Sequence, residues 1–216
     1  MGIDVWVPRV SVNHEQASTP DAIAENALPE PIDNWETLQA EVASCTKCGL
    51  CKTRIQTVFG SGNKKADWMI IGEAPGQSED QQGLPFVGKA GLLLTEMLRA
   101  ISLDREEVFI ANIVKCRPPS NRDPEAIEIE TCKTYLMRQL ALIKPKIILT
   151  VGRVAAQALL NTDQPIGKLR GKTYTLNDTP VVVVYHPAYL LRSLPDKRKA
   201  WADLKLALQT VKNIKG

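Results

Sequence analysis

Long apolar runs are missing from this sequence: no stretch approaches the roughly 20 consecutive apolar residues that cross a bilayer. Residues 1–20 hold charges and prolines instead of an apolar core, so we expect no secretory signal and a reducing, cytoplasmic location. Neither a G-x-G-x-x-G pattern nor a Walker loop occurs, which argues against dinucleotide and nucleoside-triphosphate binding. Histidine is scarce too, and His186 is the only one after residue 33.

Charge is distributed unevenly along the chain. Residues 1–44 carry eight acidic residues and one basic residue, whereas residues 45–216 carry 16 acidic and 26 basic residues. A segment with this excess of basic residues favours a polyanion, such as nucleic acid, as its partner. The alternative is that the surplus lysine only aids solubility. Residues 1–33 contain four prolines and no sustained period, which predicts a flexible acidic tail before one domain at residues 34–216.

Five cysteines form a pattern typical of a metal centre. A C-x2-C-x2-C run covers residues 45–51, and Cys116 and Cys132 follow far along the chain. The odd number and the expected reducing environment argue against disulfides. Because the run stops after three cysteines, a fourth ligand has to come from Cys116 or Cys132. Four thiolates can hold zinc or an iron–sulfur cluster, and the spacing does not choose between them.

Strand and helix patterns alternate from Asp67 onward. This alternation predicts an α/β fold, a three-layer α/β/α sandwich around a central, mainly parallel four-stranded sheet. Asp123 is expected to cap a helix that begins at Pro124. Ligands of such sheets bind beyond the carboxyl ends of the strands. The predicted strands are 68–71, 108–114, 146–151, 173–176 and 181–185, and the predicted helices are 34–43, 90–101, 124–143, 154–160 and 197–211.

Several reactive or unusual side chains follow these strands. Glu73 lies in a glycine- and proline-rich turn, Phe86 stands between Pro85 and Val87-Gly88, and His186 ends an apolar strand. Each has an ordinary structural alternative: a salt-bridged carboxylate, a core aromatic residue and a buried histidine. The leucines at 190 and 191 precede Arg192 in an expected loop, where exposed leucines suit an apolar wedge in a base stack.

Five motifs, in order, resemble those of the family 4 uracil-DNA glycosylases, the iron–sulfur branch of the uracil-DNA glycosylase superfamily. The likeness extends from about Trp35 to the C-terminus. The motifs are C-x2-C-x-L-C-x2-R with F-G-x-G at 45–62, G-E-A-P-G-x-x-E-D at 72–80, L-P-F-V-G-K-A-G at 84–91, N-I-V-K-C-R-P-P at 112–119 and H-P-A-Y-L-L-R at 186–192.

The resemblance implies hydrolysis of the N-glycosidic bond of deoxyuridine in single- or double-stranded DNA, by a monomer associated with the nucleoid. Glu73 would act on water or the sugar cation, and His186 would stabilise the departing base. A structural [4Fe–4S] cluster, with zinc as the alternative, is implied on Cys45, Cys48, Cys116 and Cys132, which leaves Cys51 over. Uracil contacts are implied for Gly72, Ala74, Glu79, Phe86 and Asn112. DNA contacts are implied for Arg117, Asn121, Leu190, Leu191 and Arg192.

The sequence departs from better-known branches of the superfamily at two positions. Ala74 stands where those branches carry an aspartate, and Gly76 lies near where a tyrosine excludes thymine. Our hypothesis is that Glu79 or a neighbouring residue takes that role. No lysine is an evident Schiff-base nucleophile, because Lys89 and Lys115 look like phosphate contacts, so we expect no lyase activity. The main alternative is a non-catalytic, metal-stabilised DNA-binding module.

Overall fold

A six-stranded sheet forms the centre of the computed structural model, which describes residues 34–215. The predicted tail at residues 1–33 therefore lies outside the described residues. The strand order is β1-β3-β2-β4-β6-β5, and β3, β2, β4 and β6 run parallel. The strands are β1 (Ser61–Gly62), β2 (Trp68–Gly72), β3 (Phe109–Asn112), β4 (Ile147–Val151), β5 (Thr173–Leu176) and β6 (Thr179–Val184).

The four parallel strands confirm the predicted centre of the sheet, and two antiparallel edge strands extend it. β1 pairs with β3, and β5 pairs with β6. Every residue of β2, β3 and β4 is buried, as apolar strands covered on both faces require. Gly72 is opposite Asn112 in register, and Val151 is opposite Val184, so the parallel strands end together at one edge.

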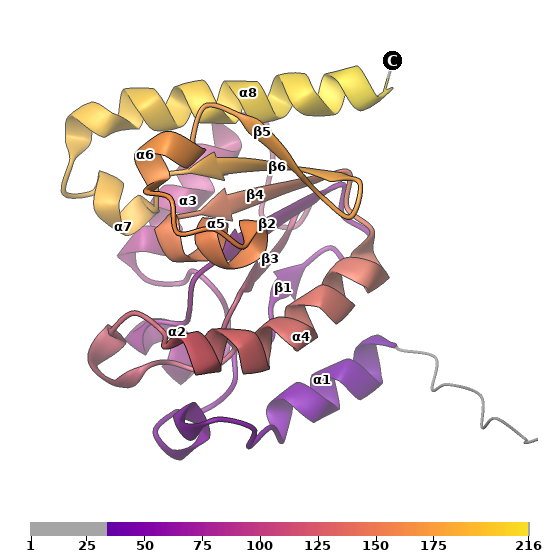
Figure 1. Cartoon of the computed structure of the whole chain (residues 1–216), viewed down its shortest axis with the longest axis vertical. Coiled ribbons are helices and arrows are strands. Elements are labelled where there is room, and N and C mark those ends of the chain that lie inside the picture. The colour runs from indigo at the N-terminus through magenta and orange to yellow at the C-terminus, as the bar shows by residue number, and fades with distance from the viewer. Residues whose placement is uncertain (1–33, 216) are drawn as a thin grey trace, which may run out of the picture. The chain divides into compact units, whose positions relative to one another are not determined.

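Helices cover both faces of the sheet and complete the predicted three layers (Figure 1). One face packs against α1 (Trp35–Ala43), α4 (Ala126–Ile143) and α5 (Arg153–Leu160). The other packs against α3 (Lys89–Arg99), α7 (Pro187–Leu190) and α8 (Lys197–Lys215). None of the described helices is both long and apolar enough to cross a membrane. The shorter helices are α2 (Gln77–Gln82), α6 (Ile166–Leu169), η1 (Gly49–Lys52), η2 (Pro119–Asn121) and η3 (Leu194–Asp196).

Two local predictions near the sheet edge were wrong. The long helix α4 begins at Ala126, and its N-cap is Glu125, whose backbone N–H donates to Glu128 at 2.8 Å. Asp123 instead accepts from Arg153 at 2.6 Å, so a long-range ion pair replaces the expected cap. The segment after His186 is also not a loop, because residues 187–190 form the helical turn α7.

Candidate active site and cysteine centre

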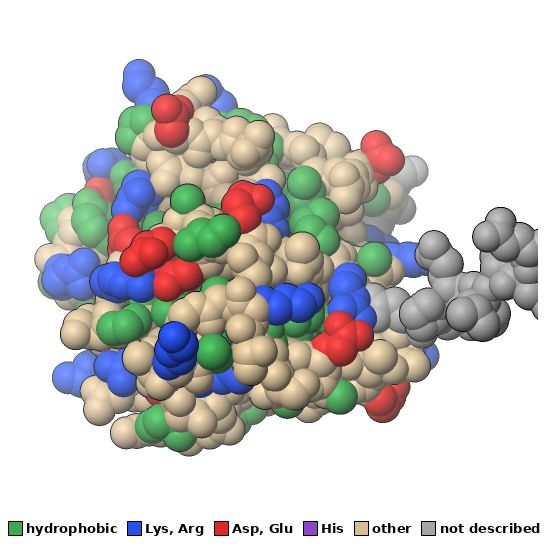
Figure 2. All heavy atoms as spheres, turned by 60° about the horizontal axis from the view of Figure 1, so that its bottom comes forward, with side chains coloured by type: hydrophobic (Ala, Val, Ile, Leu, Met, Phe, Trp, Pro, Cys, Tyr) green, Lys and Arg blue, Asp and Glu red, His purple; other side chains and the backbone are tan. Residues whose placement is uncertain are grey.

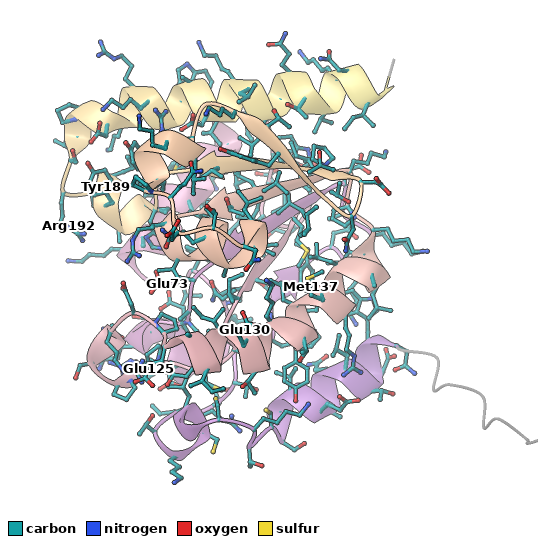
Figure 3. All side chains as sticks on the ribbon, viewed as in Figure 1. Glu73, Glu125, Glu130, Met137, Tyr189 and Arg192 are labelled. Carbon is teal, nitrogen blue, oxygen red and sulfur yellow. The ribbon has the colours of Figure 1, made fainter. Side chains whose placement is uncertain are left out.

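A cavity of about 310 Å³ opens where the parallel strands end. Its volume falls at the small end of the range for ligand pockets. In Figure 3, Glu73 lies on the same side of the molecule as Tyr189 and Arg192. The structure thus brings together most of the residues expected around the base. The lining includes Glu73, Ala74, Glu79, Phe86, Asn112, Asn121 and His186.

Gly72 makes room for two of the lining side chains. A Cβ atom at Gly72 would lie 2.4 Å from Asn112 Oδ1 and 2.5 Å from Phe86 Cζ, which is closer than real atoms approach. The absence of a side chain therefore lets the Phe86 ring and the Asn112 amide meet above the end of β2. The Phe86 ring also lies 5.8 Å from the His186 ring, tilted by 32°. Three different strand ends thus contribute to one wall.

Asn112 presents an amide that is buried yet incompletely paired. Only 2% of the residue is exposed, and its Oδ1 has no hydrogen-bond partner among residues 34–215. Such an acceptor destabilises a folded protein unless a ligand or water satisfies it. The backbone oxygen of Asn112 accepts from Lys115 Nζ at 2.9 Å, and that ammonium also donates to Gln139 at 2.6 Å. Lys115 is only 1% exposed, so its predicted phosphate contact was wrong.

His186 is held as a neutral imidazole with a defined tautomer. Burial, aided by nearby Arg192 and opposed by Glu79, lowers the pKa of His186 to about 4. The Ala188 backbone N–H donates to His186 Nδ1 at 3.1 Å. Because Nδ1 accepts this bond, the ring proton lies on Nε2. The ring therefore offers one N–H donor while it stays uncharged.

The carboxyl group of Glu73 ionises less readily than an ordinary glutamate. Burial, aided by Asp123 and opposed by Arg153, raises the pKa of Glu73 to about 7. Ala74, the next residue, cannot act as a base. Glu73 also lines a second cavity of about 580 Å³ that shares Asn121 and His186 with the first. A carboxyl group with this pKa can exchange a proton near neutral pH.

Glu79 is bound to the backbone around the cavity. Its Oε1 accepts from the N–H groups of Val87 and Gly88, both at 2.9 Å, and its Oε2 accepts from Gly76 at 3.1 Å. These three bonds fix the segment that carries Phe86. Glu79 lines the cavity as expected, and its role against thymine stays a prediction.

The expected DNA contacts divide into exposed and buried groups. Leu191 is 43% exposed, whereas Leu190 is 1% exposed and packs in the core beneath α7. The structure thus contradicts the predicted DNA contact of Leu190, because the helical turn points its side chain inward. Arg192 is exposed, and Arg117 donates to Asn121 at 2.8 Å. Figure 2 shows Lys and Arg side chains along its left edge, where β4 and β6 end in Figure 1, interspersed with acidic ones.

The cysteines expected as ligands lie near one another. Cys116 and Cys132 are buried, whereas Cys45, Cys48 and Cys51 are half-buried. Burial, opposed by Arg54 and aided by the neighbouring sulfurs of Cys132 and Cys48, raises the pKa of Cys116 to about 11. Burial likewise raises the pKa of Cys132, and Cys48 and Cys45 add to that rise. Because such electrostatic effects act only between nearby groups, the four predicted sulfurs lie close to one another.

The donor set fits an inorganic cluster. Within residues 34–215, no three Cys, His, Asp or Glu side chains converge closely enough to hold a single metal ion. Four cysteine thiolates are a ligand set that both structural zinc sites and iron–sulfur clusters use. Arg54 Nη1 donates to Cys116 Sγ at 3.0 Å, and the Lys115 N–H donates to Cys132 Sγ at 3.2 Å. Such donors commonly surround metal-bound sulfur.

Comparison with known proteins shows the family of the chain. Residues 59–205 match the model of the uracil DNA glycosylase superfamily. The chain belongs to this superfamily. It is 46% identical to the type-4 uracil-DNA glycosylase of Archaeoglobus fulgidus over 74% of this chain and 84% of the relative. It is 47% identical to the type-4 enzyme of Saccharolobus solfataricus over 81% of this chain and 85% of that one, and 38% identical to the Thermotoga maritima enzyme over 82% and 94%.

The region that matches the superfamily includes the cavity. The sequence motifs predicted some of the residues there and missed others. The sequence motifs predicted Glu73, Phe86, Asn112 and His186 around one site, and all four line it. Arg105, Gln139 and Asp196 were not predicted, although each holds a segment at this edge. No motif marks these residues, because the contacts named here join them to residues seven or more positions away, which they meet only in the folded chain.

Proposed function

We propose that this chain is a uracil-DNA glycosylase, which hydrolyses the N-glycosidic bond of deoxyuridine in DNA, releases uracil and leaves an abasic site. The observation that carries the proposal is the unpaired, buried amide oxygen of Asn112, beside the Phe86 and His186 rings in one small cavity. The type-4 relatives support the same activity. Uracil-containing DNA, single- or double-stranded, is the proposed partner, and the nucleoid is the proposed location.

Uracil has to leave the DNA stack before it can enter this cavity. The Phe86 ring would stack on the extruded base, and the Asn112 amide would meet its pairing edge. Asn112 Oδ1 accepts the N3–H of uracil, and Nδ2 donates to O4. Cytosine reverses this pattern, because it has an acceptor at N3 and an amino group at C4. The orientation of one amide therefore discriminates between the two bases.

His186 would stabilise uracil as it departs. When the bond between C1′ and N1 breaks, its electron pair leaves with the base and charge gathers on a uracil oxygen. The neutral imidazole, with its proton on Nε2, can donate a hydrogen bond to that oxygen. Backbone N–H groups of the turn at residues 72–76 can add to this stabilisation.

Glu73 would act on the sugar side of the reaction. The sugar gains oxocarbenium character, and the oxygen of water forms the new bond to C1′. The Glu73 carboxylate can orient that water, accept its proton and offset the positive charge on the sugar. The residue lines both cavities, which supports a place between the base and the rest of the DNA. We assign no base function to Ala74.

Cys45, Cys48, Cys116 and Cys132 are the proposed ligands of a [4Fe–4S] cluster. The role of that cluster would be structural: it would clamp distant segments of the chain beside the DNA-facing edge. The chain's own contribution is the burial of two thiols and the donors from Arg54 and Lys115. Cys51 is not assigned as a ligand.

The activity is tested with single- and double-stranded DNA that carries one uracil, followed by alkaline cleavage of abasic sites. We expect strand breaks at the uracil position, and a strong loss of rate in His186→Ala and Glu73→Ala. If the unaltered protein binds this DNA but produces no break at any concentration, the proposal is overturned in favour of a non-catalytic DNA-binding module.

A further inference from the structure

The backbone of Phe86 is held in an unfavourable conformation. Its φ angle is 53°, in the left-handed region that residues other than glycine rarely adopt. Such a conformation persists only where surrounding contacts impose it. The contacts around this residue therefore decide where its ring lies above the cavity.

One side of the Phe86 segment is fixed through its N–H groups. Glu79 accepts from the residues that follow Phe86, Val87 and Gly88, both at 2.9 Å. These bonds do not involve the carbonyl groups of Pro85 and Phe86, which need a different partner. A carboxylate cannot hold them, because it has no proton to donate when ionised.

The other side is fixed through these carbonyl groups by Arg105. Its Nη2 donates to the Pro85 oxygen at 2.8 Å, and its Nη1 donates to the Phe86 oxygen at 3.2 Å. Arg105 lies in the turn between α3 and β3 and is half-buried, and its Nη1 also donates to Thr95 of α3 at 3.4 Å. The planar guanidinium presents several donors in a fixed arrangement, which suits two adjacent carbonyl oxygens.

Helix α3 also packs against the backbone of Phe86. A Cβ atom at Gly91 would lie 1.8 Å from the Phe86 oxygen. This glycine therefore lets the helix press directly against the carbonyl that Arg105 holds. Arg105 itself is not among the residues that line the 310 Å³ cavity, so it acts on the site only through Phe86 and its neighbours.

We propose that Arg105 is a positioning residue that fixes the Phe86 ring as a stacking platform for the extruded base. The inference rests on the proposed function, because it assigns the ring a flat base as its partner. Without the guanidinium, the strained backbone at Phe86 relaxes and the ring leaves its position against Gly72.

The test compares Arg105→Met, Arg105→Lys and the control Arg99→Met, which removes an exposed arginine that pairs with Glu96 in α3. Single-turnover release of uracil from single-stranded DNA and inhibition by free uracil are measured below the melting temperature of each variant. We expect Arg105→Met to weaken inhibition by free uracil roughly 5- to 100-fold, the range that loss of one base–aromatic stack produces. Arg105→Lys should lie between it and wild type, and Arg99→Met should match wild type.

A double-mutant cycle with Phe86→Ala separates positioning from general stability. If Arg105 acts through the ring, Arg105→Met adds nothing to the loss of rate in Phe86→Ala. Additive losses, or unchanged inhibition by uracil in folded Arg105→Met, overturn the inference. If Arg105→Met fails to fold, Arg105→Lys decides, and wild-type inhibition in that variant overturns it too. Absence of uracil release by the unaltered protein would instead overturn the proposed function.

Discussion

Glu73 has a pKa of about 7, so both of its protonation states are populated near neutral pH. If its carboxylate orients water, the single-turnover rate should rise with pH, with a midpoint near 7. Glu73→Gln should lose most of the rate and all of this rise. Rates between about pH 5.5 and 8.5 measure the effect, and His186 stays neutral throughout because its pKa is about 4. A rate that falls with pH would show that the protonated form of Glu73 is active.

The same carboxyl group should make the protein less stable as pH rises. The folded protein binds the Glu73 proton more tightly than the unfolded chain, whose pKa is near 4.5, so stability falls between about pH 4.5 and 7. Glu73→Gln removes this loss and should stabilise the protein by about 1–3 kcal/mol above pH 7. Thermal melts at pH 4 and pH 8 measure the difference. A gain of equal size at both pH values would contradict the explanation.

Asn112 should determine which base is released. In Asn112→Asp, a carboxylate can accept from the amino group of cytosine but cannot donate to O4 of uracil. We expect uracil release to fall roughly 100-fold or more and cytosine release to appear. Asn213→Asp makes the same chemical change at an exposed position of α8 and should alter neither rate. Measurement uses matched oligonucleotides with uracil or cytosine at one site, and an unchanged base preference would contradict the assignment.

At the scale of elements, the segment from α7 to η3 carries Leu191, the exposed leucine that we propose as a wedge in DNA. Asp196 anchors the segment on both sides of Leu191, because it accepts from Tyr189 at 2.5 Å and from Ser193 at 2.9 Å. Lys199 pairs with the same carboxylate at 2.8 Å. The leucine thus projects from a braced turn, as a wedge between bases requires.

Leu191→Ala should therefore impair the reaction on duplex DNA more than on single strands, since only the duplex has a stack to refill. We expect a loss of about tenfold on duplex DNA. This loss is about 1.4 kcal/mol, which lies within the few kcal/mol that unstacking one base step costs. Leu194→Ala is the matched control, because Leu194 is 61% exposed in the next turn and is assigned no contact. The two substrates are compared in single-turnover experiments, and equal losses on both would argue against a wedge.

Elements differed in how well the sequence predicted them. The apolar runs of β2, β4 and residues 181–184 of β6 identified these strands, because strands buried on both faces need mostly apolar side chains. The start of α4 was misplaced, because Asp123 pairs with Arg153 from another element. Leu190 and Leu191 looked equivalent in the sequence, and only the turn of α7 separates the buried side chain from the exposed one.

At the scale of the whole molecule, the proposed cluster connects segments that are distant in the sequence. The sulfurs come from the loop after α1, the segment after β3 and the middle of α4. Cys116→Ser should therefore lose iron, brown colour and thermal stability, whereas Cys51→Ser should retain all three. Iron analysis, visible absorption and melting curves measure this. Equal iron in the two variants would show that Cys116 is not a ligand.

The residues that line the site could be predicted from the sequence, whereas the residues that hold them in position could not. Sequence motifs located the side chains that touch the cavity, because these follow the strand ends that a parallel sheet gathers at one edge. They did not reveal that Lys115 is buried beneath Asn112, or that Arg105 reaches the carbonyl oxygens of Pro85 and Phe86. Such contacts depend on the packing of elements that are separate in the chain.

The unpaired oxygen of Asn112 has a consequence for the pace of repeated turnover. An empty site leaves this acceptor unmet, and a freed uracil satisfies it as well as an attached one does. We therefore expect the detached base to stay bound after the sugar bond has broken. Its escape should then be a slow stage of each cycle whenever the chemistry itself is fast.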